Sequence, residues 1–149
     1  MDLTLVEQLA CREMAAAGLE GWEFAWDRAK RRAGVCRFGN RTISLSRPLM
    51  ELFAHEEVLD TIRHEIAHAL VGPEHKHDAV WRAAARRLGA TPKARMPASL
   101  PTPPPTWVGE CPRGHQFRRY RRPSAKVSCS ACHPTFDARF VVEWERAAA

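Results

Sequence analysis

No apolar run in this sequence approaches the roughly 18 residues that a membrane-spanning helix needs, which excludes a helical membrane protein. In residues 1–18, the acidic Asp2 and Glu7 stand where a secretory leader would carry basic residues before an apolar block. We therefore expect a cytoplasmic protein without membrane contact. The 149 residues are 45% hydrophobic and 27% charged, which is typical of a soluble globular chain. This length allows one core and one small accessory module.

Acidic residues are scarce in the stretch 91–126. It contains eight Lys or Arg and one acidic residue, Glu110, so its positive excess is larger than the net charge of +6 of the whole chain. A basic module of this kind favours a polyanionic partner such as DNA or RNA. A solvated cationic surface explains the same composition equally well.

The five cysteines are an odd number, and three of them lie in the last quarter of the chain: Cys111, Cys129 and Cys132. In a reducing compartment, such clustering indicates metal ligation more than disulfide bonding. Cys11 and Cys36 stand alone in the sequence, and we expect them to be buried packing residues.

Hydrophobic spacing predicts an amphipathic helix from Leu3 to Ala17, extended stretches near residues 22–26, 33–38 and 43–45, and a hairpin turn at residues 39–40. These stretches predict a small antiparallel sheet. A central helix is expected over residues 55–71 and a second helix from its cap Asp78 to Gly89. The central helix should turn one apolar stripe to the core, namely Val58, Leu59, Ile62, Ile66, Ala69 and Leu70. The predicted organisation is a core over residues 1–90, a Pro-rich linker over 91–106 and an accessory module over 107–149.

His64 and His68 are four residues apart on the predicted central helix, so both imidazoles can reach one ion from successive turns. They lie nearly opposite the centre of the apolar stripe, which places them in a cleft or in solvent. Glu65 sits beside the first His and can contact a metal-bound water. This is the HExxH pattern, in which zinc lowers the pKa of the water and polarises a carbonyl while the carboxylate transfers the proton. The alternative is a solvated helix face that carries these residues by coincidence.

A catalytic zinc requires a third protein ligand and one open position. Just after the helix-ending Gly72-Pro73, the chain offers Glu74, His75 and His77, and spacing alone leaves the choice open. An extended metzincin pattern does not fit, because its glycine and third histidine would fall on Val71 and Glu74. A thermolysin-like glutamate ligand has no candidate, since the second predicted helix contains no Glu.

The run HEIAHAL, the glycine-containing turn, and residues 77–81 (HDAVW) resemble the SprT-like metallopeptidases, which include the Spartan proteases. Residues 32–36 and 42–46 resemble the strand pair that precedes the active-site helix of this family. The resemblance implies an α+β fold, with a zincin-like core of N-terminal helix, small antiparallel sheet, active-site helix and second helix. It also implies that His77 is the third ligand, although Asp78 stands where the family commonly has Gly. The implied activity is zinc-dependent cleavage of a protein or peptide substrate, including proteins bound to DNA.

Two short ligand pairs lie in the C-terminal region, Cys111 with His115 and Cys129 with Cys132, separated by thirteen residues. Three thiolates and one imidazole form the closed tetrahedral set of a structural zinc. A unit of this size has too small a core to fold readily without a cross-link. His133 is an alternative fourth ligand, and a redox-active Cys129/Cys132 pair is the rival interpretation. SprT-like proteins often end in a zinc ribbon, usually with four cysteines, so the resemblance implies a ribbon in which His115 is a substitution.

Five residues between these pairs could contact nucleic acid, with arginines on phosphates and the aromatic ring on a base: Arg118, Arg119, Tyr120, Arg121 and Arg122. A charged surface hairpin is an equally good interpretation. The leading hypothesis is a monomeric zinc endopeptidase with one catalytic and one structural zinc, in which Glu65 is general base and then general acid. A non-catalytic nucleic-acid-binding zinc protein is the second hypothesis, and a zinc hydrolase of small amides is a third.

Overall fold

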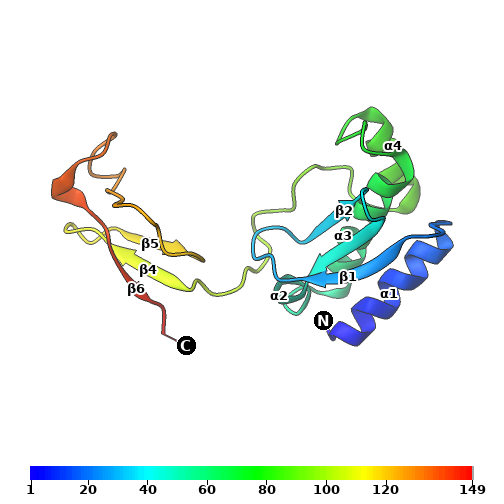
Figure 1. The fold of residues 1–149 in the computed structure, drawn as a ribbon, viewed down its shortest axis with the longest axis horizontal. Coiled ribbons are helices and arrows are strands. Elements are labelled where there is room, and N and C mark those ends of the chain that lie inside the picture. The colour runs from blue at the N-terminus through cyan, green and yellow to red at the C-terminus, as the bar shows by residue number, and fades with distance from the viewer. Residues whose placement is uncertain (149) are drawn as a thin grey trace. The chain divides into compact units, whose positions relative to one another are not determined.

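The structure is a computed structural model that describes residues 1–148. By its internal contacts the chain divides into two units, Met1–Pro103 and Pro104–Ala149, and the division falls inside the Pro-rich segment 91–106. Figure 1 shows the elements of each unit. None of the helices within residues 1–148 has the length and apolar composition that a membrane span requires.

The first unit begins with α1 (Leu3–Ala16), whose N-terminus is capped by the Asp2 carboxylate. The ammonium group of Met1 donates hydrogen bonds to the carbonyls of Met50, Glu51 and Phe53, which ties the chain start to the end of α2 (Arg47–Met50). The buried face of α1 joins the main core through Val6, Leu9, Ala10 and Met14. Cys11 lies on the outer face of α1 and is exposed, and Cys36 is half-buried, so the expectation that both are buried is wrong.

Three strands form the sheet of the first unit: β1 (Glu23–Asp27), β2 (Gly34–Arg37) and β3 (Thr42–Ser46), in the order β1-β3-β2. The hairpin of β2 with β3 is antiparallel, as expected. However, β3 inserts between β1 and β2 and pairs parallel with β1, so the sheet is mixed and the prediction of a purely antiparallel sheet is wrong. This order makes β3 the central strand, which is buried along its whole length, and leaves β2 at an edge.

The central helix α3 (His55–Val71) packs against α1, α4, β2 and β3. Its buried residues include Val58, Ile62 and Ile66, as the apolar stripe predicts, but Leu70 is 45% exposed. The buried sector is shifted because α4 (Ala79–Leu88) covers Ala67 and β2 covers Glu65. The α+β class and the predicted order of helices and strands are confirmed.

The second unit is a three-stranded antiparallel sheet in the order β5-β4-β6, formed by β4 (Trp107–Glu110), β5 (Gln116–Arg119) and β6 (Glu143–Arg146). A short 3-10 helix, η1 (Ala138–Phe140), precedes β6. Among the described residues of the second unit, the buried apolar cluster consists of Cys111, Cys129 and Val142. Two of these three residues carry thiols, so this unit has little hydrophobic core of its own.

Candidate active site and metal centres

Three histidine side chains converge in the first unit. His64 and His68 come from successive turns of α3, and His77 comes from the loop between α3 and α4. The Nε2 atom of His77 lies 3.1 Å from Nε2 of His64 and 3.1 Å from Nε2 of His68. The three candidate ligand atoms all lie within 4.8 Å of one another.

This convergence fits a shared metal ion. Each neutral imidazole has a single N–H, so hydrogen bonding alone poorly satisfies three nitrogen atoms that face one another. Zn–N bonds of 2.0–2.1 Å in tetrahedral geometry place neighbouring nitrogens about 3.3 Å apart, close to the spacing found here. Burial and the neighbouring histidines lower the pKa of His64 to about 4. Burial, followed by the charge of His77, lowers the pKa of His68 to about 4 as well, so both rings keep their lone pairs free for a cation at neutral pH.

Trp81 of α4 supports this group of rings. It is fully buried, and its ring centroid lies 4.6 Å from that of His64, 5.2 Å from that of His68 and 4.6 Å from that of His77. Trp81 belongs to a buried cluster with Ala84 and Ala85, the residues that helical spacing places on the same face of α4. Its contact with all three imidazoles was not foreseen, because helical periodicity identifies the buried face without identifying its neighbours.

His75 and Glu74 do not join the histidine cluster. The Nδ1 atom of His75 lies 2.7 Å from Oδ2 of Asp78, while Oδ1 of Asp78 accepts a hydrogen bond from the Trp81 backbone at 3.0 Å. Asp78 therefore caps α4 and holds His75 away from His77. Among the three residues that spacing left open, the structure brings His77 to the other two imidazoles.

The Glu65 side chain is buried, with 7% of the residue exposed. Burial raises the pKa of its carboxyl to about 7, against the opposing effects of the Arg32 charge and of a hydrogen bond from the Cys36 backbone N–H. Gly34 of β2 leaves the space that the carboxylate occupies, because a Cβ atom at that position would lie 2.8 Å from Cγ and 2.9 Å from Oε1 of Glu65. Sequence reasoning did not single out Gly34 for this role, although it lies in the strand pair that carries the family resemblance.

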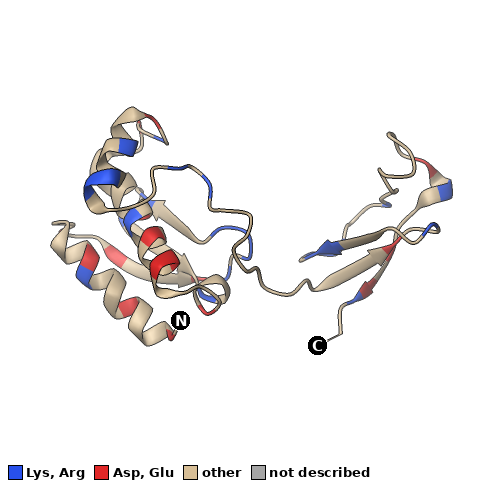
Figure 2. Cartoon of the chain, turned by 180° about the vertical axis from the view of Figure 1, so that it is seen from behind, with Lys and Arg blue, Asp and Glu red and all other residues tan. Residues whose placement is uncertain are grey.

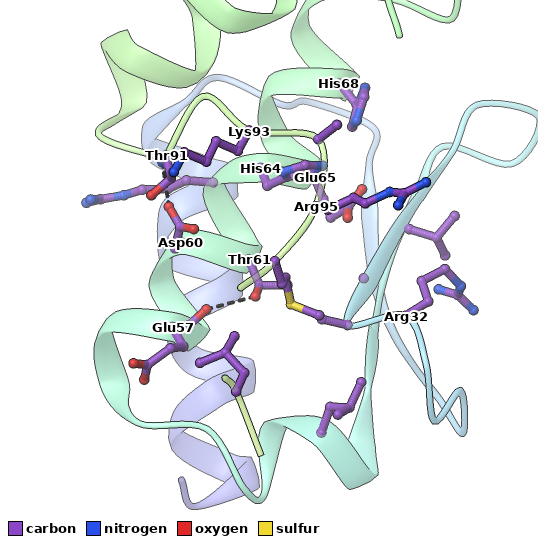
Figure 3. Close-up of a pocket in the computed structure, with 18 of the residues that line it drawn as sticks. Arg32, Glu57, Asp60, Thr61, His64, Glu65, His68, Thr91, Lys93 and Arg95 are labelled. Atoms are coloured by element: carbon purple, nitrogen blue, oxygen red, sulfur yellow. Dashed lines mark hydrogen bonds between the residues drawn. The ribbon is translucent and has the colours of Figure 1, made fainter. Parts of the chain in front are cut away.

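These groups open into a cleft with a volume of about 1350 Å³. Figure 3 shows His64, Glu65 and His68 on the α3 wall and Arg32 near the β2 wall. The segment after α4 also lines the cleft, with Lys93, Arg95 and the residues up to Thr102. The sequence predicts this segment to be a linker and gives no sign of its place beside the histidines, because it has no periodicity.

The SprT-like family model matches residues 4–101. The chain belongs to the SprT-like family. Neither the curated proteins nor the solved structures contain a match to the chain. Membership indicates a domain of zinc-metallopeptidase type, and the SprT-like match includes the whole histidine cluster and all of the cleft lining except Thr102.

Beyond the SprT-like match, the second unit holds a second metal-binding group of Cys111, His115, Cys129 and Cys132. The Nδ1 atom of His115 lies 3.3–3.5 Å from each of the three sulfurs, and the sulfurs of Cys111 and Cys132 are 3.9 Å apart. Tetrahedral zinc requires about 3.6 Å between sulfur and nitrogen and about 3.8 Å between two sulfurs. The fit supports a zinc ribbon. His133 is turned away from the group, toward Thr135.

Basic residues of the second unit lie on β5 and β6 (Figure 2), and the strand register divides them between the two faces of the sheet. Trp107 of β4 pairs with Arg119 and Arg146, so these three side chains share one face. The guanidinium of Arg119 lies over the Trp144 ring, and those of Arg122 and Arg146 lie over the Trp107 ring. Arg118 occupies the opposite face. Tyr120 is half-buried at the end of β5, and Arg121 is exposed beside it.

Proposed function

We propose that this chain is a zinc-dependent endopeptidase. The observation that carries the proposal is the convergence of three imidazole nitrogens beside a buried carboxylate, at the wall of an open cleft. The cleft is larger than the 300–1,000 Å³ of typical small-molecule pockets, which favours a polypeptide over a small amide as substrate.

His64, His68 and His77 would hold the catalytic zinc. When bound, zinc supplies Lewis acidity, which lowers the pKa of a water molecule and polarises a substrate carbonyl. Glu65 accepts the proton of the attacking water and then donates it to the leaving amine. The hydrogen bond from the Cys36 backbone and the absence of a side chain at Gly34 fix the position of this carboxylate. Trp81 packs on the three imidazole rings and orients them.

Replacing Glu65 with Gln tests this assignment. The amide keeps the size of the side chain but cannot act as a base, so we expect Glu65→Gln to bind zinc normally and to lose at least about a hundredfold in kcat/KM on an unfolded polypeptide. Elemental analysis and a cleavage assay on the same preparation measure both quantities. Undiminished cleavage by Glu65→Gln would refute the role of the base. A parent chain that binds zinc but cleaves no polypeptide would instead favour the non-catalytic zinc protein, which has no use for a buried carboxylate at this position.

We further propose that the zinc-ribbon unit contacts nucleic acid, so that DNA-associated proteins are substrates. The supporting observation is the face of its sheet on which Trp107, Phe117 and Trp144 lie together with Arg119 and Arg146. Aromatic rings interleaved with guanidinium groups suit stacked bases and phosphates. The non-catalytic alternative, a nucleic-acid-binding zinc protein, would use the same face.

Binding of fluorescent single-stranded DNA at several salt concentrations tests the ribbon face. We expect affinity to fall steeply with added salt, because each phosphate contact releases counterions. Replacing Arg118, Arg119, Arg121 and Arg122 together with Ala should weaken binding strongly. Arg119→Ala should cost more than its matched control on the opposite face, Arg118→Ala. Salt-independent binding, or equal losses for the two single variants, would contradict this assignment.

We place the protein in the cytoplasm and expect it to act as a monomer. Free thiols in a zinc-ligating arrangement suit a reducing compartment, because oxidation would remove the thiolate ligands. A single chain contains all the candidate zinc ligands of both sites.

A further inference from the structure

The segment that follows α4 forms part of the cleft wall and is held in place at both ends. At its start, the Thr91 backbone N–H donates a hydrogen bond to Asp60 of α3 at 2.6 Å. At its end, Leu100 packs against the main hydrophobic core, and Pro103 is buried. Between these anchors the side chains of residues 93–99 are exposed along the cleft. Two fixed ends confine this stretch to the neighbourhood of α3.

Arg95 is the cation that this segment places nearest the chemical groups. Figure 3 shows its side chain extending over the opening between α3 and β2, the region in which His64 and Glu65 lie. Lys93 extends in the other direction, toward Thr91 and Asp60 (Figure 3). Arg95 is exposed, and it takes part in none of the ion pairs or hydrogen bonds among the described residues.

Four acidic residues line the cleft, Glu56, Glu57, Asp60 and Glu65, and none of them forms an ion pair with Arg95. Asp60 accepts the hydrogen bond from Thr91, and the buried Glu65 carboxylate accepts one from the Cys36 backbone and has Arg32 as its nearby charge. Glu56 and Glu57 lie in the first turn of α3, about two helical turns from the histidines. Within residues 1–148, the Arg95 guanidinium therefore lines the cleft without an ion pair.

We propose that Arg95 is a specificity-determining residue that binds an acidic side chain of the substrate close to the bond that is cut. The proposal rests on the peptidase function proposed above and names the substrate feature that this site selects. A guanidinium is always charged and offers paired donors that match a carboxylate. We favour a substrate carboxylate over a nucleic-acid phosphate because the cleft that Arg95 lines contains the candidate zinc ligands, beside which a bound peptide would lie.

Matched peptides test the proposal. A neutral peptide that the zinc-loaded full chain cleaves is first identified from a digest of an unfolded protein. Each residue that flanks the scissile bond is then replaced in turn by Asp, Asn or Lys. At one flanking position we expect kcat/KM to be about three- to fivefold higher for Asp than for its neutral isostere Asn, the range of a partly exposed ion pair. This ratio should shrink as salt is added.

Variants of the enzyme complete the experiment. Arg95→Ala should bring the Asp-to-Asn ratio to about one while the neutral peptide is still cut, and Arg95→Glu should favour Lys at the same position. Arg12→Ala removes an exposed arginine of α1 outside the cleft and should leave the ratio unchanged. If the zinc-loaded parent cleaves no peptide at all, the peptidase function itself is refuted.

Three results would overturn the role of Arg95 while leaving the peptidase function intact. The first is a parent enzyme that cuts Asp and Asn peptides equally. The second is an Arg95→Ala variant that loses the same factor on every peptide, which would indicate general support of the site. The third is an Arg95→Ala variant that keeps the parental Asp-to-Asn ratio but binds DNA more weakly than the parent. That result would show that Arg95 contacts a nucleic-acid phosphate and not a substrate carboxylate.

Discussion

At the scale of single residues, the position of Glu65 depends on what its neighbours lack as much as on what they offer. The carboxylate occupies space that any side chain at Gly34 would fill, and it accepts a hydrogen bond from the backbone of the same strand. Gly34 does not have the positive φ that would demand glycine on backbone grounds. Glycine at this position therefore leaves room for the Glu65 carboxylate.

Replacing Gly34 with Ala should displace the Glu65 side chain while the backbone of β2 stays in place. We expect kcat/KM to fall about ten- to a hundredfold, because a misplacement of about 1 Å is costly at a reacting group. Zinc content should be unchanged, since Gly34 is not among the candidate ligand residues. Steady-state kinetics and elemental analysis measure the two effects.

Gly39→Ala is the matched control, because a Cβ atom at Gly39 would meet nothing within 4 Å. It should retain parental activity and zinc. If Gly34→Ala also cleaves at the parental rate, Glu65 does not work from the position seen in the structure.

At the scale of elements, the sequence predicts local features well and long-range arrangements poorly. The pairing of His64 with His68 follows from helical spacing alone, and the cap role of Asp78 follows from its residue type and position. Pairing between β1 and β3 joins two strands that are separated in the sequence by β2. No local pattern encodes such a pairing. The sheet prediction therefore identified the three extended stretches but not their order.

The third imidazole illustrates the same limit at the site itself. Spacing left Glu74, His75 and His77 open, and the family resemblance favoured His77. In the structure, the contact between His75 and Asp78 turns one candidate away, and the packing of Trp81 places the other ring against His64 and His68. Both effects depend on how the loop between α3 and α4 folds together with the first turn of α4, so residue spacing could not reveal them.

At the scale of the whole molecule, the two units depend on metal to different degrees. The first unit has a large core that includes Ile43, Leu45 and Phe53, none of which is a candidate ligand. The second unit buries mainly two of its own ligands, Cys111 and Cys129, together with Val142. Without the metal, these thiols would bury little apolar surface and would lose their cross-link.

Stepwise removal of zinc should therefore separate the two sites. We expect two equivalents of zinc in the purified chain, with the histidine-bound ion removed first by a chelator because an open cleft gives access to it. Its loss should abolish cleavage and leave the first unit folded. The ribbon zinc, held by three sulfurs and a nitrogen, should leave only with unfolding of the second unit. Elemental analysis, cleavage assays and circular dichroism at each chelator concentration follow these events.

Two variants assign each equivalent to its site. His64→Ala together with His68→Ala should remove only the labile zinc, and Cys129→Ala should remove only the resistant one. The histidine variant should keep the fold of both units, because the hydrophobic core of the first unit contains none of the three histidines. The cysteine variant should unfold the second unit and still cleave a short peptide, since every group of the proposed active site lies in the first. If the chain holds only one class of zinc, and the double histidine variant keeps all of it, the cleft does not bind zinc. The proposed peptidase reaction, which depends on zinc in the cleft, would then be wrong.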